Sequence, residues 1–231
     1  MRLHRFYINK PLGEEIVVVE KKLVHQWIHV FRYTVGDEVM LFSPHIAGED
    51  SVYRISSHTK TSVTLSQVTT QPHIIPSSNI TLVMAVVKKD TFETIARQAT
   101  ELGVTSIVPI LSARSEKKNL NMERLQAIVT EAAEQSGRGT VPIIEAICTF
   151  DEALQKTSGL VNIVASLRAQ THTVSDISTC ALWIGPEGGW TEEEEGAFAE
   201  KGFVSLRLTE TTLKADTAAV AALTSILATT W

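Results

Sequence analysis

The residues best suited to chemistry lie in one glycine-rich loop, Gly185-Pro186-Glu187-Gly188-Gly189. An apolar run of strand character, Ala181 to Ile184, leads into this loop, and Thr191 to Glu194 has the spacing of a capping box that opens a helix. Glycines carry no Cβ, so a ligand can lie against bare backbone N–H and C=O groups. The pattern predicts a strand, loop and helix start able to hold a flat, polar cofactor.

The loop by itself leaves a second interpretation open. A Gly-Pro-x-Gly-Gly sequence can be a tight turn only, and the acidic run Glu192 to Glu195 can simply complement a helix N-terminus. The loop matches neither G-x-G-x-x-G nor G-x-x-x-x-G-K-[ST]. This argues against a Rossmann dinucleotide site and against a P-loop.

Length and composition indicate an ordinary globular protein with one large domain or two modest ones. The 231 residues are 44% hydrophobic, which is enough to bury a core. The first residues lack an apolar targeting segment, and no run reaches the roughly 18 apolar residues of a membrane span, so we expect no membrane association. Cys148 and Cys180, the only cysteines, lack metal-ligand spacing, and a reducing cytoplasm fits best.

Charge is spread unevenly along the chain. The net charge of −5 argues against a protein that coats polyanions. Residues 1–75 carry 8 Lys and Arg against 7 Asp and Glu, and the remainder carries 13 against 19, so any nucleic-acid contact must be local. His25 and His29 have the spacing of a zinc-binding pair, but no third ligand is suggested nearby, so we expect no metal.

The first seventy residues form a β-rich region in which only Lys22 to Phe31 looks helical. The predicted strands are Ile16 to Glu20, Glu38 to Phe42, Val52 to Ile55 and Ser62 to Val68. Short strands at this spacing suggest a compact barrel, a common platform for RNA or for another protein. Arg2, Arg5, Arg32 and Arg54 could form a modest phosphate-binding face or be scattered surface charge.

A linker, Gln71 to Asn79, separates this region from one of a different pattern. We place the boundary after residue 71, giving domains 1–71 and 72–231. Apolar strands beginning at Ile80 then alternate with helices, the first of which Asp90 and Glu93 are predicted to cap. This alternation predicts a parallel sheet covered on both faces, with the ligand beyond the carboxyl ends of the strands, where the glycine loop falls.

Three segments taken together resemble the RsmE family of ribosomal RNA methyltransferases in the SPOUT, or trefoil-knotted, superfamily. They are Glu131 to Arg138 (E-A-A-E-Q-S-G-R), Ile184 to Gly189 (I-G-P-E-G-G) and Leu208 to Ala219. The opening His4-Arg5-Phe6-Tyr7 and the turn Gly36 to Val39 also look like that family. The resemblance spans nearly the whole chain, and the combination of the first two motifs is specific where each alone is weak.

The resemblance implies an α/β fold in which a small PUA-like β-barrel that binds RNA (1–71) precedes a SPOUT-type trefoil-knotted parallel sheet domain (72–231). It implies a homodimer that transfers a methyl group from S-adenosylmethionine to N3 of a uridine in the decoding region of 16S rRNA. The expected partner is 16S rRNA within the assembled small ribosomal subunit. Periodicity and composition do not predict the knot, because threaded backbones are rare.

The chain departs from the family pattern at two places. In the last motif Thr209 stands for a glycine, Thr211 and Lys214 stand for arginines, and Asp216 stands for a glutamate. Threonine stiffens a loop that passes close to the cofactor, and lysine cannot copy the bidentate fork of arginine. Ser166 to Ala169 occupies the place of a His-Pro loop.

These considerations assign candidate residues to three roles. The cofactor-binding set is Leu167, Ile184, Gly185, Pro186, Glu187, Gly188, Leu208, Thr209, Leu213 and Thr217. The RNA-binding set is Arg5, Arg114, Lys117, Lys118, Gln135 and Arg138, and the catalytic candidates are Arg138 and Asp216. Methyl transfer from a sulfonium needs positioning and no metal, while uridine N3 must lose a proton, which a carboxylate or a cation could promote.

Simpler roles remain open for some of these residues. Asp216 precedes an apolar run and could be a helix cap, Arg138 could complement a helix dipole, and Glu187 could merely close its turn. At the level of the whole protein, the alternatives are a SPOUT methyltransferase acting on transfer RNA and a non-catalytic relative that only binds ribosomal RNA.

Overall fold

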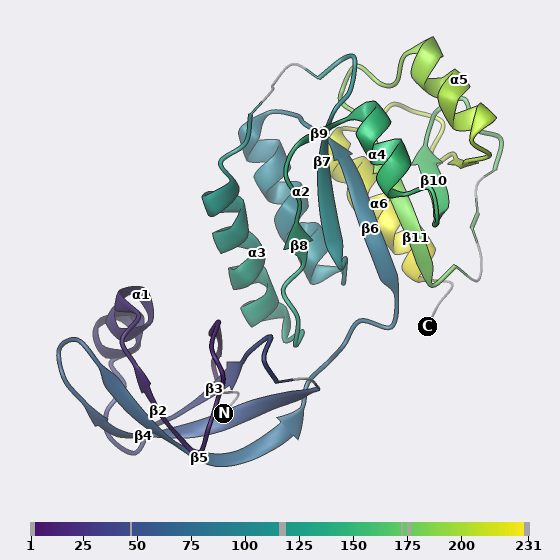
Figure 1. Cartoon of the computed structure of the whole chain (residues 1–231). Coiled ribbons are helices and arrows are strands. Elements are labelled where there is room, and N and C mark those ends of the chain that lie inside the picture. Colours follow the sequence, from purple (N-terminus) through teal and green to yellow (C-terminus); the bar gives the residue numbers. More distant parts are fainter. Residues whose placement is uncertain (1–2, 47, 116–118, 172, 175–176, 229–231) are drawn as a thin grey trace. The chain divides into compact units, whose positions relative to one another are not determined.

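The computed structural model describes residues 3–46, 48–115, 119–171, 173–174 and 177–228. The chain forms two compact units. The first unit comprises residues 1–75 and 133–140, and the second comprises residues 76–132 and 141–231. Figure 1 labels the helices and strands of both units.

The first unit holds a mixed sheet of five strands within the described residues, in the order β1-β3-β4-β5-β2. The pair β1 and β3 is parallel, and the other pairs are antiparallel. The helical prediction for Lys22 to Phe31 is confirmed by a short α-helix that continues as a π-helical turn. The elements are β1 (Arg5–Tyr7), β2 (Glu15–Val18), α1 (Lys21–His25), η1 (Gln26–Val30), β3 (Glu38–Phe42), β4 (Glu49–His58) and β5 (Val63–Pro72).

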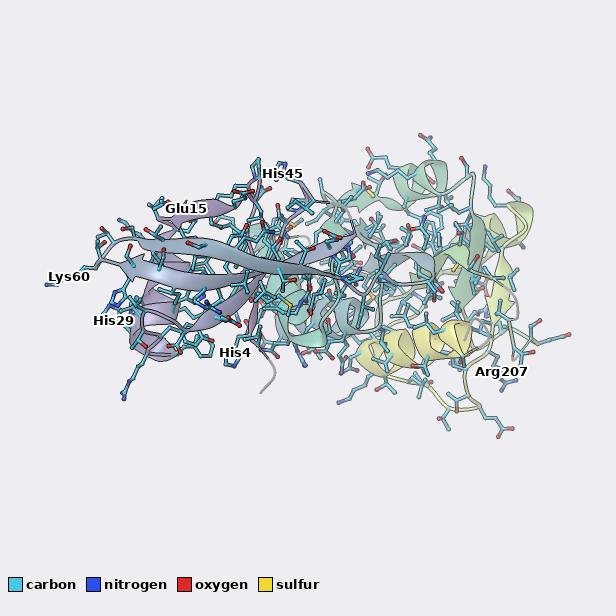
Figure 2. The ribbon with its side chains drawn as sticks, turned by 90° about the horizontal axis from the view of Figure 1, so that it is seen from below. His4, Glu15, His29, His45, Lys60 and Arg207 are labelled. Carbon is cyan, nitrogen blue, oxygen red and sulfur yellow. The ribbon has the colours of Figure 1, made fainter. Side chains whose placement is uncertain are left out.

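The sheet of the first unit packs its apolar face against the helical turns. Trp27 from η1 and Tyr53 from β4 are fully buried in this core, where Phe6 meets Trp27 edge-on at a ring distance of 5.3 Å. β1 was not predicted, because three residues are too few to show an alternation. Figure 2 shows polar side chains such as His29 and Lys60 projecting from this unit.

The second unit is an α/β structure built on a parallel sheet. Among the described residues the sheet has seven strands, in the order β12-β10-β11-β6-β7-β8, with β9 also paired to β7, and each pairing is parallel. The elements are β6 (Asn79–Ala85), α2 (Lys89–Glu101), β7 (Ser106–Leu111), α3 (Met122–Ser136), β8 (Ile143–Ile144), β9 (Cys148–Thr149), α4 (Phe150–Lys156), β10 (Val161–Ala165), β11 (Thr179–Ile184), α5 (Glu192–Glu200), β12 (Val204–Leu206) and α6 (Ala215–Leu227).

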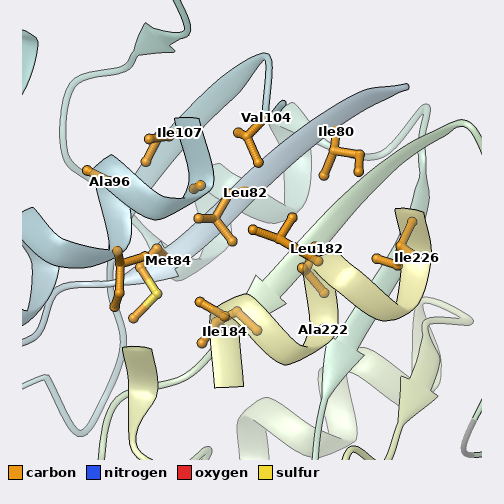
Figure 3. Close-up of a cluster of buried hydrophobic side chains, with 14 of the residues drawn as sticks. Ile80, Leu82, Met84, Ala96, Val104, Ile107, Leu182, Ile184, Ala222 and Ile226 are labelled. Atoms are coloured by element: carbon orange, nitrogen blue, oxygen red, sulfur yellow. The ribbon is translucent and has the colours of Figure 1, made fainter. Parts of the chain in front are cut away.

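Helices cover both faces of this sheet, as predicted. Leu82 of β6 and Leu182 of β11 face the helices α2, α3 and α6 in one buried cluster (Figure 3). Their neighbours Val83 and Trp183 point the opposite way, into a second cluster with α4 and α5. Successive side chains of a strand alternate between faces, so a strand buried on both sides must be apolar throughout. This is why β6 and β11 read as unbroken apolar runs.

The predicted cap of the first helix in the second unit is wrong. The N-cap of α2 is Lys88, which makes no side-chain cap hydrogen bond. Glu93 instead accepts a hydrogen bond of 2.6 Å from Arg124 Nε of α3, and this bond lowers the pKa of the Glu93 carboxyl. The helix begins at Lys89, so Asp90 lies inside its first turn and Glu93 bonds to the neighbouring helix instead.

No helix in the described part of the chain is both long and apolar enough to span a bilayer.

Candidate functional site

A pocket of about 380 Å³ lies where three neighbouring strands of the parallel sheet end. Ala165, Ile184 and Leu206 are the last residues of β10, β11 and β12, and all three line the pocket. The connections that follow these strands supply the remaining walls. Ligands of parallel α/β sheets bind at this edge, so the position agrees with the expectation from the sequence.

The glycine loop forms one wall of the pocket through a hydrogen-bonded turn. The backbone N–H of Gly189, whose φ is 70°, donates to Pro186 O at 2.8 Å. Arg114 clamps the same loop from the β7 side: its Nη1 donates to Gly188 O at 2.7 Å and to Trp190 O at 3.1 Å. The loop is therefore held by its own turn hydrogen bond and by Arg114.

Two glycines of the loop lie close to neighbouring side chains, which leave little space for a Cβ. A Cβ on Gly185 would lie 3.0 Å from Cε2 of Trp190, and one on Gly188 would lie 3.3 Å from Cδ of Arg114. Trp190 is itself fixed, since it is nearly buried and its Nε1 donates to Ala165 O at 3.3 Å. The indole thus ties the loop to the end of β10.

The helix after the loop begins with the predicted capping box. The Thr191 side chain accepts from the backbone N–H of Glu194, and the Glu194 carboxylate accepts from the backbone N–H of Thr191 at 2.8 Å. Glu194 is buried, and its other oxygen accepts from the backbone N–H of Ala113 at 2.8 Å. One carboxylate therefore both caps α5 and joins it to the segment after β7.

Polar groups and aliphatic walls meet around the pocket. Leu208 and Leu213 supply apolar surface, while Glu187 and Glu195 bring carboxylates. Ser166 Oγ donates to Glu195 Oε1 at 2.8 Å, which fixes the direction of that carboxylate. An aliphatic slot flanked by backbone groups and carboxylates suits a flat heterocycle that carries a cationic tail.

The pocket gathers nine of the ten residues predicted to bind a cofactor. They are Leu167, Ile184, Gly185, Pro186, Glu187, Gly188, Leu208, Thr209 and Leu213. Thr217 does not line it; its backbone N–H donates to Asp216 Oδ1 at 2.8 Å in the first turn of α6. Thr209 lines the pocket without a positive φ, so the threonine in place of a glycine causes no backbone strain.

Other lining residues were not predicted, although the rule on strand ends points to their segments. Ser166 and Arg168 follow β10, Trp190 and Glu195 follow β11, and Thr211 follows β12. Their segments are recognisable from the strand pattern. Which side chains turn inward depends on hydrogen bonds between segments, such as that of Ser166 with Glu195.

Asp216, one catalytic candidate, lies in the first turn of α6 and does not line the pocket, whereas Ala215 and Ala218 do. The N-cap of α6 is Lys214, so Asp216 is not the capping residue. An acidic side chain in the first turn still complements the helix dipole.

Two predicted RNA-binding residues, Arg5 and Arg138, are buried in the first unit. Arg5 forms a bidentate pair with Asp50, with Nε to Oδ2 at 2.7 Å and Nη2 to Oδ1 at 2.9 Å. Its Nη1 donates to Ala133 O at 3.4 Å and to Arg138 O at 3.1 Å. Arg5 thus secures the backbone after α3.

The Arg138 side chain is only 4% exposed, and its Nη2 donates to Thr140 Oγ1 at 3.1 Å. Burial lowers the pKa of Arg138 to about 10, so the guanidinium keeps its charge at neutral pH. His73 lies beside the same cluster, with Nδ1 3.4 Å from Asp50 Oδ1. Its ring packs on Gly139, where a Cβ would lie 2.0 Å from His73 Cγ.

The remaining RNA-binding candidates are placed differently. Gln135 is exposed near the end of α3. Arg114 is exposed and belongs to the pocket wall, while Lys117 and Lys118 lie outside the described residues. In the part of the chain that the structure describes, no group of three or more His, Cys, Asp or Glu is arranged to hold a metal ion.

The comparisons with known proteins agree on one kind of relative. Residues 75–227 match the family described as RNA methyltransferase domain. The ribosomal RNA small subunit methyltransferase E of Rickettsia conorii is 32% identical over 239 residues, covering 98% of this chain and 96% of that protein. The protein of the same name from Aquifex aeolicus is 30% identical, covering 94% and 96%.

A solved structure shares the whole fold. The ribosomal RNA small subunit methyltransferase E of Neisseria gonorrhoeae, bound to S-adenosyl methionine, superposes with a TM-score of 0.88 at 29% identity. The match covers 100% of this chain and 98% of that chain.

Proposed function

Because the chain belongs to the ribosomal RNA small subunit methyltransferase E family, we propose that it transfers a methyl group from S-adenosylmethionine to 16S rRNA. The observation that carries the proposal is the pocket at the ends of β10, β11 and β12, which gathers nine of the residues assigned to this cofactor. Bound cofactor would supply an electrophilic methyl group on a sulfonium. The chain itself has to bind and orient the cofactor and to exclude water from the site.

The pocket fits the cofactor in size and in chemistry. A volume of about 380 Å³ lies in the range of small-molecule sites. Leu167, Leu208 and Leu213 would enclose the adenine, and the bare backbone at Gly185 and Gly188 would approach it closely. The Glu187 and Glu195 carboxylates would face the cationic part.

We place the methyl acceptor at N3 of a uridine in the decoding region, within the assembled small subunit. N3 must lose its proton before it can attack in line. Asp216 follows the pocket-lining Ala215, and we assign it the part of general base. Asp216→Asn should then reduce methyl transfer at saturating cofactor by roughly 10²-fold or more, the contribution typical of general base catalysis.

A matched control tests whether Asp216 acts by chemistry or by helix stability. Asp151 occupies the first turn of α4, as Asp216 does of α6, and its side chain is exposed. Asp151→Asn should leave methyl transfer unchanged. Equal losses in the two variants would remove the catalytic assignment of Asp216.

We assign the RNA side to Gln135 and Arg138, with Arg114, Lys117 and Lys118 as phosphate partners. Gln135 is exposed and accessible to RNA. Arg138 would stabilise the deprotonated uridine, a role that requires RNA binding to uncover its buried guanidinium. Arg138→Ala should abolish methylation while cofactor binding stays near normal, and loss of cofactor binding would contradict this assignment. Arg5 would position Arg138 through its hydrogen bond to Arg138 O.

The same proposal extends to architecture and setting. We propose that the first unit is a PUA-like barrel that binds RNA, that the second unit is threaded as a trefoil knot, and that the protein works as a homodimer in the cytoplasm. The parallel sheet with helices on both faces and the likeness to the Neisseria gonorrhoeae enzyme support the architecture.

Radiolabelled S-adenosylmethionine and small ribosomal subunits that lack the modification provide the direct test. Label on N3 of the decoding-region uridine, mapped by mass spectrometry, is the expected result. Calorimetric binding of the cofactor without label transfer would contradict the proposal. Free transfer RNA would then be the next substrate, and failure there would leave a non-catalytic binder, for which the altered motif at Thr209, Thr211 and Lys214 is the specific argument.

A further inference from the structure

The rings of His4, Phe31 and Tyr33 lie close to one another on the first unit and form an aromatic ladder. The rings of His4 and Phe31 lie 4.4 Å apart at 33°, and those of Phe31 and Tyr33 lie 5.4 Å apart at 14°, which is a stacked arrangement. His4 Nδ1 and the Tyr33 hydroxyl close the ladder with a hydrogen bond of 2.5 Å. His4 is exposed, and Phe31 and Tyr33 are half-buried. Figure 2 labels His4 at the surface of the first unit.

Core packing accounts for only part of this ladder. Phe31 and Tyr33 pack their inner edges on the core around Trp27 and Phe6. The exposed His4 and the exposed parts of Phe31 and Tyr33 are aromatic surface that the core does not use.

An arginine with an unusual backbone conformation lies between two residues of the ladder in the sequence. Arg32, which is exposed, is the non-glycine residue with positive φ (57°) among the described residues. Arg32 directly follows the C-cap of η1, Phe31, and the backbone N–H of Tyr33 donates back to Trp27 O at 2.9 Å. Glycine or asparagine is the usual residue at such a position, because a Cβ is unfavourable there. Arg32 therefore occupies a position at which glycine would give a more stable fold.

The charge of this surface differs in sign from that of the chain. Residues 21–36 include Lys21, Lys22 and Arg32, two histidines, and no Asp or Glu, whereas the whole chain carries a net charge of −5. Asp37 follows directly, but its carboxylate accepts from the backbone N–H and hydroxyl of Thr34. The stretch therefore offers positive charge interleaved with aromatic rings.

We propose that this ladder, with Arg32, is a stacking site for unpaired bases of single-stranded RNA. Every base has a face that can stack on an aromatic ring, and stacking combined with a backbone-directed cation is the usual means of gripping single strands. Unpaired bases would stack on the outward ring faces of the ladder, while Arg32 meets a phosphate. This site rests on the proposed function, because it assigns the RNA substrate to a defined surface of the first unit.

Binding of a fluorescein-labelled dodecauridine to the full-length protein tests the site, with anisotropy read over a series of salt concentrations. His4→Ala should weaken binding roughly 5- to 150-fold, the range for loss of one stacked base. Arg32→Gly should weaken binding and reduce the slope of log K against log salt by about 0.7, the share of one single-strand phosphate contact. The same Arg32→Gly variant should melt at an equal or higher temperature, because glycine relieves the positive φ.

Lys60→Gln is the matched control, because Lys60 is an exposed cation of the same unit that lies apart from His4 (Figure 2). It should change the affinity by less than twofold. Normal binding by both His4→Ala and Arg32→Gly would overturn the inference, as would a preference for a 12-base-pair RNA duplex over the single strand. Methyl transfer by the unaltered protein is measured in parallel. Its absence would count against the proposed function alone, and intact transfer with unaffected variants would count against the ladder alone.

Discussion

Replacing Asp50 by alanine should destabilise the first unit strongly. The substitution removes both carboxylate oxygens that bind the Arg5 guanidinium at 2.7 and 2.9 Å. The side chains of Arg5 and Asp50 are only 6% and 3% exposed, so water cannot replace the lost partner without opening the structure. Arg5 is also held by Ala133 O and Arg138 O and cannot swing out freely.

The expected cost follows from leaving one charge buried and uncompensated. Removing one member of a buried ion pair typically costs about 3–5 kcal/mol. A domain of this size is stable by about 5–15 kcal/mol, so the loss is a large part of the total. The end of α3 and the segment after it should loosen as well, because Arg5 donates hydrogen bonds to Ala133 O and Arg138 O.

Hydrogen exchange followed by mass spectrometry can read the two units separately. In Asp50→Ala, peptides from β1 and β3 should exchange faster by the equivalent of about 3–5 kcal/mol of opening free energy, while peptides from β11 should change little. The control is Glu38→Ala, which breaks the Arg54 pair of the same sheet. That pair has the same 2.7 Å distance, but its side chains are 56% and 31% exposed. Its loss should cost less than about 1 kcal/mol.

The comparison of the two variants decides whether burial sets the cost. Equal effects of Asp50→Ala and Glu38→Ala would refute the argument from burial. A loss below about 1 kcal/mol in Asp50→Ala would refute it too, because it would mean that Arg5 finds water or another partner.

Two further predictions concern the second unit. Gly185→Ala should weaken S-adenosylmethionine binding by about 1–3 kcal/mol in calorimetry, since the new Cβ would lie 3.0 Å from Trp190. Gly196→Ala is the control: nothing lies within 4 Å of its Cβ in α5, so affinity should not change. Burial raises the pKa of Cys180 to about 11, so the folded thiol keeps its proton where the unfolded thiol has lost it. Stability in urea should therefore fall as pH rises from about 8.5 towards 11, more steeply than in Cys180→Ala, and parallel pH profiles would contradict the predicted effect of burial.

Local sequence patterns were sufficient for the architecture of the second unit. Apolar strands alternating with helical repeats predict a parallel sheet covered on both faces, and the sheet confirms this. The capping box at Thr191 and Glu194 is also confirmed, because its partners lie three residues apart. By contrast, the predicted cap at Asp90 and Glu93 is wrong: the N-cap is Lys88, and Glu93 binds Arg124, 31 residues further along the chain.

Periodicity within a few residues is enough to predict most of the strands and helices and the edge of the sheet that carries the glycine loop. It is not enough for β1, which has only three residues. The tertiary structure decided which distant side chains meet. It brings Arg114 onto Gly188 O, and Arg5 onto Asp50 and Arg138 O, across separations that leave no periodic trace. It also places residues 133–140 in the first unit. Such pairings depend on how whole elements pack. Arg5, which the sequence suggested as a surface RNA contact, is therefore buried and bonded to Asp50 and Arg138 O.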